Sequence, residues 1–423
     1  MTRFVLVLLI AWGSTAAAQH HDEEDRPPFE LRQPQPGDGP LSVYLRLLEA
    51  ADRFEPQTGS DSFVKGQLAQ YAGKLGLHRE ALRWDGLAYG HVISDSVGVL
   101  PPGTSALDAA NEIVRRAEDR RVVMVNEAHH DASSRLLTFD LLEPLYDQGF
   151  RYLAAETFAP DSILSAVTDY PTVGMGYYTN EPVFGALVRK ALRLGYTLVR
   201  YEQDREDPEI DSLDYGQNRE YWQARHLKER VFDLDADARL LVHAGYGHIH
   251  ESPSEHSTPM GWYLRELTGT DPLTVSQTEV WAASTPEHRH PAVRAALEAG
   301  LLTDRPVVLE AGGEPVTVSH REIPVDLVVI RPPTSRPVAT LGYGALRSLP
   351  LPDACGPCVV EVRRSDEGPD AVPVDRVAVG YAGLPALEGG TVEMLGPRDV
   401  PLVVTVLDGT SDRVLDRRIA VAR

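Results

Sequence analysis

Four predicted strands each end in side chains that could do chemistry. The apolar run 122–125 leads, through Asn126, to Glu127, His129 and His130. Polar or ionisable residues also end the other three runs: Glu156 after 152–155, Arg200 with Tyr201 and Glu202 in 197–202, and His243, Tyr246 and His248 after 239–242. Ligands of open parallel sheets bind beyond the carboxyl ends of the strands, so we expect these groups to converge at one sheet edge.

The expected cluster contains acids, bases and a cation. We expect His130 to act as general base or metal ligand, with Glu127 or Glu156 orienting or coordinating. His248 is the expected second base, ligand or oxyanion donor, and Arg200 the counter-charge. The set His130, Glu156 and His248 also offers the nitrogen and oxygen ligands of a catalytic divalent metal such as Zn, Mn or Co.

Each of these residues also has a structural interpretation. A glutamate at a strand end, such as Glu156 or Glu202, can simply cap the next helix. His243 follows apolar residues and can be a hydrogen-bonded core histidine. Gly245 and Gly247 flank Tyr246 and would let the backbone turn sharply or approach a ligand closely.

The alternation of strand and helix patterns predicts an α/β fold with a parallel-sheet, three-layer core. Helix-period segments separate the strand patterns, and a last strand is predicted near 273–277, with edge strands at 307–309 and 325–330. The predicted helices are 106–117, 133–146, 181–194 and 218–234.

Composition changes along the chain predict five segments. They are a signal peptide (1–18), a flexible leader (19–40), a helical cap (41–100), an α/β core (101–331) and a β-rich, sandwich-like C-terminal domain (332–423). The cap contains one helical pair of tetratricopeptide type at 66–84, and one pair does not make a repeat array.

The chain start and the charge bear on location and partners. Arg3, the apolar run 4–12 and the small residues 16–18 are typical of a cleavable secretory signal, so we expect a periplasmic or extracellular protein. No later segment has the length of a membrane span. The net charge of −21 argues against nucleic-acid binding, and we expect a small-molecule or peptide substrate.

Cys355 and Cys358 are the two cysteines of the chain. Their spacing is that of thioredoxin-type redox motifs, in which the first thiol starts a helix. Here the second cysteine instead runs into the strand pattern 359–362. We therefore predict a structural disulfide that closes a tight turn in an oxidising compartment.

The strand-end motifs of residues 108–280 resemble those of a known superfamily. The motifs are Asn126-Glu127-Ala-His129-His130, Ala155-Glu156-Thr, Asn218-Arg219-Glu220 and Gly245-Tyr-Gly-His248. They look like the superfamily that joins erythromycin esterase, the ChaN haem-binding lipoproteins and the Tiki/TraB/GumN proteins. Its first motif is Gly-Glu-x-x-His, which places Glu127 and His130 on the two ionisable positions. Asn126 departs from the glycine that the family usually carries.

The resemblance implies three different functions. In the esterase-like branch, Glu and His of the first motif activate water to open an ester. In the Tiki-like branch, His and Glu hold a divalent metal for peptide hydrolysis. In the ChaN-like branch the module binds haem, for which His129, Tyr246 and His248 are the axial candidates. We expect an exported hydrolase of an ester or amide, with a non-catalytic haem- or metal-binding protein as the alternative.

Overall fold

The computed structural model describes residues 29–54, 56, 58–90, 99–167, 169–255, 257–317, 324–346, 349–380 and 391–423. The predicted signal peptide and the leader up to residue 28 lie outside the described residues. Of the helices described, none is long and apolar enough to cross a membrane.

In the described chain, nine strands form one sheet with the order β1-β7-β9-β6-β2-β5-β3-β4, and β8 pairs with β7. The strands from β9 to β4 run parallel, whereas β7, β1 and β8 pair antiparallel at one edge. The bounds are β1 (Ser105–Asp108), β2 (Val122–Glu127), β3 (Tyr152–Ala155), β4 (Thr197–Val199), β5 (Leu240–Gly245), β6 (Leu273–Ser276), β7 (Val307–Ala311), β8 (Glu314–Pro315) and β9 (Leu327–Ile330).

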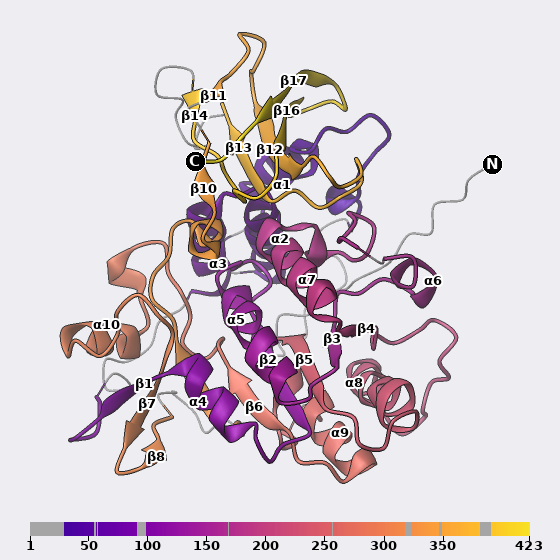
Figure 1. Cartoon of the computed structure of the whole chain (residues 1–423), viewed down its shortest axis with the longest axis vertical. Helices are drawn as coiled ribbons and strands as arrows, with labels where there is room; N and C mark the ends of the chain where they lie inside the picture. Colours follow the sequence, from indigo (N-terminus) through magenta and orange to yellow (C-terminus); the bar gives the residue numbers. More distant parts are fainter. Residues whose placement is uncertain are drawn as a thin grey trace.

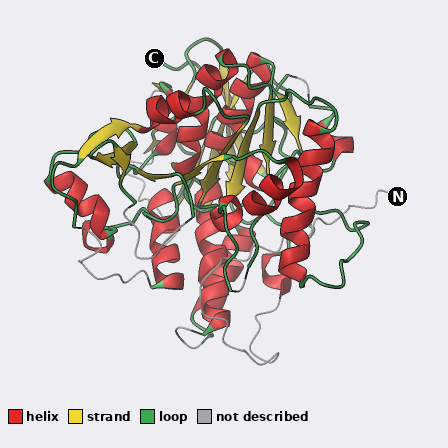
Figure 2. Ribbon diagram, turned by 90° about the horizontal axis from the view of Figure 1, so that it is seen from below, coloured by secondary structure: helices red, strands yellow, loops and turns green. Residues whose placement is uncertain are grey.

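Helices cover both faces of this sheet, so the core has three layers (Figure 2). Val123 and Val125 of β2 face α4 (Ala109–Arg116), α5 (Ser134–Asp147) and α7 (Pro182–Leu194). Val122 and Met124 face α8 (Tyr215–Leu227) and α9 (Met260–Thr268). Successive side chains of a strand point to opposite faces, which explains why a buried parallel strand is apolar throughout. The α/β fold class is confirmed.

Two predicted elements differ from the structure. The helix predicted at 106–117 starts later than expected, because residues 105–108 pair with β7 and form β1. The helix α4 begins after Asp108, whose side chain caps it by accepting a hydrogen bond from the N–H of Asn111. The predicted strand 197–202 ends at Val199, so Arg200, Tyr201 and Glu202 lie on a loop.

The remaining elements are α1 (Ser42–Ala51), α2 (Gly59–Lys74), α3 (His78–Tyr89), α6 (Asp161–Leu164), α10 (Pro291–Glu298), a π-helix η5 (Lys228–Phe232), and 3-10 turns η2 (Phe29–Arg32), η4 (Tyr178–Asn180), η6 (Tyr246–Ile249), η7 (Pro286–His288) and η8 (Pro337–Leu341). The helices α1, α2 and α3 pack together, with Val359 and Ala378 of the C-terminal strands in the same core. In Figure 1, α1 lies beside β12 and β13 in the upper part of the view, whereas the central-sheet strands β2, β5 and β6 lie in the lower part.

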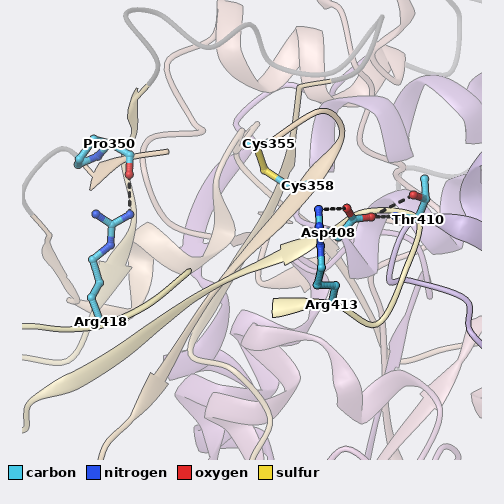
Figure 3. Close-up of a disulfide and its surroundings, with 7 residues drawn as sticks. All are labelled: Pro350, Cys355, Cys358, Asp408, Thr410, Arg413 and Arg418. Atoms are coloured by element: carbon cyan, nitrogen blue, oxygen red, sulfur yellow. Dashed lines mark hydrogen bonds and ion pairs between the residues drawn. A yellow bond between two sulfur atoms is a disulfide. The ribbon is translucent and has the colours of Figure 1, made fainter. Parts of the chain in front are cut away.

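The C-terminal strands form a four-stranded antiparallel sheet, β13-β12-β16-β17, and two short strand pairs. The bounds are β10 (Gly344–Ala345), β11 (Leu349–Pro350), β12 (Cys358–Arg364), β13 (Asp375–Val379), β14 (Thr391–Val392), β15 (Leu395–Gly396), β16 (Leu402–Asp408) and β17 (Val414–Ala420). The predicted disulfide joins Cys355 to Cys358 at the start of β12 (Figure 3). The adjacent β16–β17 turn is fixed by Asp408, whose carboxylate accepts from Thr410.

Candidate functional site

The last residue of β2 and the turn that follows it form the centre of the candidate site. Glu127 Oε1 lies 2.9 Å from Nδ1 of His129, and both side chains are buried. β2 ends at Glu127, and the turn at residues 129–130 brings His129 back against it. A carboxylate only accepts hydrogen bonds, so Nδ1 donates to Glu127 and Nε2 is the nitrogen left to act as a base or ligand.

Buried cations and donors surround Glu127. Arg135, at the start of α5, donates from Nε to Oε2 at 2.6 Å and from Nη2 to Oε1 at 3.1 Å. His243 of β5 places Nε2 2.9 Å from Oε2. Burial raises the pKa of Glu127, but Arg135, His129 and His243 outweigh it and hold the pKa well below the usual value. Glu127 is therefore a carboxylate at neutral pH.

Arg135 is itself fixed by a second carboxylate. Its Nη1 donates to Glu181 Oε2 at 2.8 Å, and its side chain is only 2% exposed. Glu181 caps α7 by accepting from the N–H groups of Val183 and Phe184. Glu181 at the start of α7 thus positions the guanidinium of Arg135, at the start of α5, and this guanidinium pairs with Glu127.

Glu156 follows β3 and lies on the other side of His129. Its Oε2 accepts from Gly245 N–H at 2.7 Å and stands 3.9 Å from His129 Nε2. Arg219 of α8 donates to Oε1 at 2.7 Å. Burial raises the pKa of Glu156, but His248, Arg219 and His129 lower it well below its usual value. A second carboxylate therefore faces Nε2 of His129.

His248 and Arg219 form the more open side of the site. His248 Nδ1 lies 2.6 Å from Glu220 Oε1, and Nε2 lies 3.6 Å from Glu156 Oε1. Burial lowers the pKa of His248, but Glu220 and Glu156 outweigh it and raise the pKa to about 10. His248 is therefore an imidazolium at neutral pH, and its 3.2 Å contact with Arg219 Nη1 is an approach of two cations. The carboxylates of Glu156, Glu202 and Glu220 compensate their charge.

Aromatic rings and a glycine define the position of the His129 ring. Tyr178 stacks on it at 3.9 Å with 12° between the planes, and Tyr246 meets it edge-on at 5.1 Å. A Cβ on Gly245 would lie 2.5 Å from the ring atoms of His129, so only glycine fits. Tyr246 has φ +41°, the only positive φ of a non-glycine residue in the described chain. Backbone strain of this kind is concentrated at functional sites.

The structure brings together Glu127, Glu156 and His248 of the predicted set, and His129 in place of His130. His130 Nδ1 lies 3.3 Å from Asp85 of α3, and its carbonyl packs on Gly73 of α2. His130 therefore joins the helical cap to the core. The turn after β2 directs the two adjacent histidines to different partners.

The expected counter-charge also comes from a different residue. Arg200 pairs with Asp204 at 2.7 Å, and Arg219 instead binds both Glu156 and Glu202. Arg219 and Glu220 were predicted only as part of a motif, and the roles of Arg135, Glu181 and Tyr178 were not predicted. A cation in the first turn of a helix opposes the helix dipole, which was a signal that Arg135 has a buried acidic partner.

The predicted metal ligands do not form a metal site. His130 faces Asp85, and the nitrogens of His248 face Glu220, Glu156 and Arg219. One group of at least three His, Cys, Asp or Glu residues in the described chain brings all its ligand atoms within 4.8 Å of one another, and it consists of Asp204, Asp207 and His226. The residues at the sheet edge therefore do not fit the divalent metal expected there.

The haem candidates fit poorly as well. His248 is protonated at neutral pH, and burial holds the Tyr246 phenol neutral by raising its pKa well above the usual value. His129 Nε2 faces Glu156 across the space where a Cβ on Gly245 would contact both side chains. A haem iron at this nitrogen would have to displace Glu156 and its Arg219 partner.

No protein-family model matches the chain, and no curated protein matches it. Solved structures with partial similarity include the type III effector HopBA1, at 16% identity and TM-score 0.28 over 45% of this chain and 96% of that one. RRSP, a MARTX toxin effector domain from Vibrio vulnificus, gives 13% identity and TM-score 0.27 over 56% of this chain and 52% of that one. A third similar structure is the C-terminal region of Pasteurella multocida toxin, in which a thiol-protease-like catalytic triad is described. It gives 11% identity and TM-score 0.31 over 95% of this chain and 61% of that one. TM-scores this low carry no argument about fold or function.

Proposed function

We propose that this chain is an exported hydrolase of the erythromycin-esterase/ChaN/Tiki type that cleaves an ester or amide. The resemblance implies Glu127 and His130 as the residues that activate water, and we assign that role to Glu127 and His129, because His129 is the histidine that contacts Glu127. The observation that carries the proposal is the 2.9 Å contact of His129 Nδ1 with an ionised Glu127. That contact orients the ring and stabilises the imidazolium that forms when Nε2 takes a proton.

Each residue has one role in the proposed reaction. A water molecule at His129 Nε2 gives up a proton to that nitrogen while its oxygen attacks the substrate carbonyl carbon. The negative charge that develops on the carbonyl oxygen is stabilised by the His248 imidazolium, with Arg219 beside it. The tetrahedral intermediate then collapses, and His129 returns the proton to the leaving alcohol or amine.

Glu156 supports this arrangement in two ways. Its Oε2 lies 3.9 Å from His129 Nε2, too far for a direct hydrogen bond and near enough for one water to contact both atoms. Its negative charge also keeps His248 protonated. We therefore assign Glu156 to positioning the water and the oxyanion-binding cation.

The two adjacent histidines provide the test. We expect His129→Ala and Glu127→Gln to lower kcat/KM by about 10²- to 10⁴-fold on a panel of activated esters and peptides. His130→Ala is the matched control, because His130 contacts Asp85 instead of Glu127. Loss of activity in His130→Ala with His129→Ala fully active would overturn the assignment. No hydrolysis of any panel member by the unmodified protein would reject the proposed activity.

A further inference from the structure

A second cluster of ionisable side chains lies outside the proposed catalytic residues. It joins the loop that follows β4 to the helix α8: Asp204 and Asp207 are on the loop, and His226 is near the end of the helix. One ligand atom of each lies within 4.8 Å of those of the other two. His226 is buried and Asp207 is nearly so, with its side chain 13% exposed.

The orientation of His226 is that of a metal ligand. Its Nδ1 lies 3.2 Å from the carbonyl oxygen of Tyr201 and 3.1 Å from that of Glu202. Carbonyl oxygens only accept, so Nδ1 carries the proton and Nε2 faces the carboxylates. Ligating histidines characteristically donate their other N–H to a carbonyl or carboxylate in this way.

The spacing of His226 Nε2 and Asp207 Oδ1 allows one metal ion, with bonds of about 2.0–2.2 Å to each atom, to bind both. The separation from Oδ1 is 3.3 Å, longer than the roughly 2.7–2.9 Å of a charge-assisted hydrogen bond. Without a cation or an added proton, a nitrogen lone pair would face a carboxylate oxygen. A divalent ion bound by both atoms removes this repulsion.

The surrounding charge leaves room for such an ion. Residues 200–214 contain seven Asp or Glu and two Arg, a formal charge of 2 − 7 = −5. Arg200 and Arg230 each contact Asp204, at 2.7 and 3.3 Å. A carboxylate has about four lone-pair sites, so Asp204 can keep an arginine partner while binding a metal.

We propose that Asp204, Asp207 and His226 bind a zinc-class divalent ion that clamps the β4–α8 loop onto α8. One imidazole and two carboxylates suit Zn²⁺, with water completing the coordination. The clamp connects the two segments that carry Glu202 and Arg219, which are ion-paired in the candidate active site. This site is separate from the proposed hydrolytic residues and stands whether or not the chain hydrolyses esters.

The test measures Zn²⁺ binding by titration calorimetry and Co²⁺ binding by its visible absorption, on the full chain stripped of metal by a chelator. All variants carry His20→Ala and His21→Ala, because an N-terminal histidine pair can itself trap metal. We expect about one Zn²⁺ per chain, with affinity at least about 100-fold lower in His226→Gln and Asp207→Asn. His248→Gln and His130→Gln are matched histidine controls and should bind normally.

Three results would overturn the proposal. They are no Zn²⁺ binding at about 100 μM, undiminished binding in both His226→Gln and Asp207→Asn, or loss of binding in His248→Gln alone. Circular dichroism shows whether each variant is folded. If the His226 and Asp207 variants are not, Asp204→Asn decides, since its side chain is 33% exposed: weaker binding supports the site and unchanged binding rejects it.

Discussion

Replacement of Arg135 by methionine tests whether the buried ion pairs under the candidate site hold it together. Methionine keeps the apolar contact with the Phe184 ring, over which the guanidinium lies at 5.3 Å, and removes the charge. The guanidinium donates to Glu127, to Glu181 and to the carbonyl of His129. Both carboxylates are 2% exposed or less, so the variant leaves them buried without their cation.

Breaking a buried pair by removing one partner costs about 3–5 kcal/mol. Histidine contacts remain at Glu127, and two backbone N–H groups remain at Glu181, so we expect the lower end, about 3 kcal/mol at pH 7. The assay is urea unfolding followed by circular dichroism. Arg225→Met is the control, because it breaks an exposed ion pair between Arg225 of α8 and Glu229 of η5 and should cost less than about 0.5 kcal/mol.

The pH dependence gives the same prediction a second check. The pKa of Glu127 is depressed in the folded protein, so its favourable contribution is present above the ordinary value of 4.5 and is lost as pH falls below it. In Arg135→Met this carboxyl protonates more easily, so the deficit should shrink from pH 7 toward pH 4. A deficit below about 1 kcal/mol at pH 7, or one that does not change with pH, would refute the reasoning.

Two further predictions concern His129 and His248. Gly245→Ala should lower the rate of hydrolysis at least about 100-fold, because its Cβ would lie 2.5 Å from the His129 ring. Gly247→Ala is the control and should change the rate little, because its Cβ would lie 3.3 Å from His250. Equal kinetics of the two variants would contradict this prediction. The pKa of His248 is raised from 6.5 to about 10, so its stabilising contribution is complete below pH 6.5 and is lost as pH rises through about 10. His248→Gln should therefore be less stable than the unmodified protein at pH 7, with a difference that closes by pH 10–11 in thermal unfolding; a constant difference would contradict the assignment.

The sequence was enough to predict the fold class and the sheet edge at which Glu127, Glu156 and His248 meet. The apolar runs of β2 and β5 are buried on both faces, and this leaves their continuous hydrophobic pattern in the sequence. Glu127, the last residue of β2, and Glu156, the first residue after β3, lie at the sheet edge because strand direction alone places them there. The disulfide could also be predicted from the sequence, because Cys355 and Cys358 are only three residues apart.

The partners of these residues were decided by the tertiary structure. His129 and His130 are adjacent and chemically identical, and they differ only because the turn after β2 directs one toward Glu127 and the other toward Asp85 of α3. Arg219 binds Glu156 across 63 residues of sequence, while Arg200, nearer in the chain, binds Asp204. Local patterns indicate which face of an element is apolar, because that depends only on the residue types and their spacing along the chain. Ion pairs and hydrogen bonds depend on the distance between atoms of separate elements, and packing sets that distance.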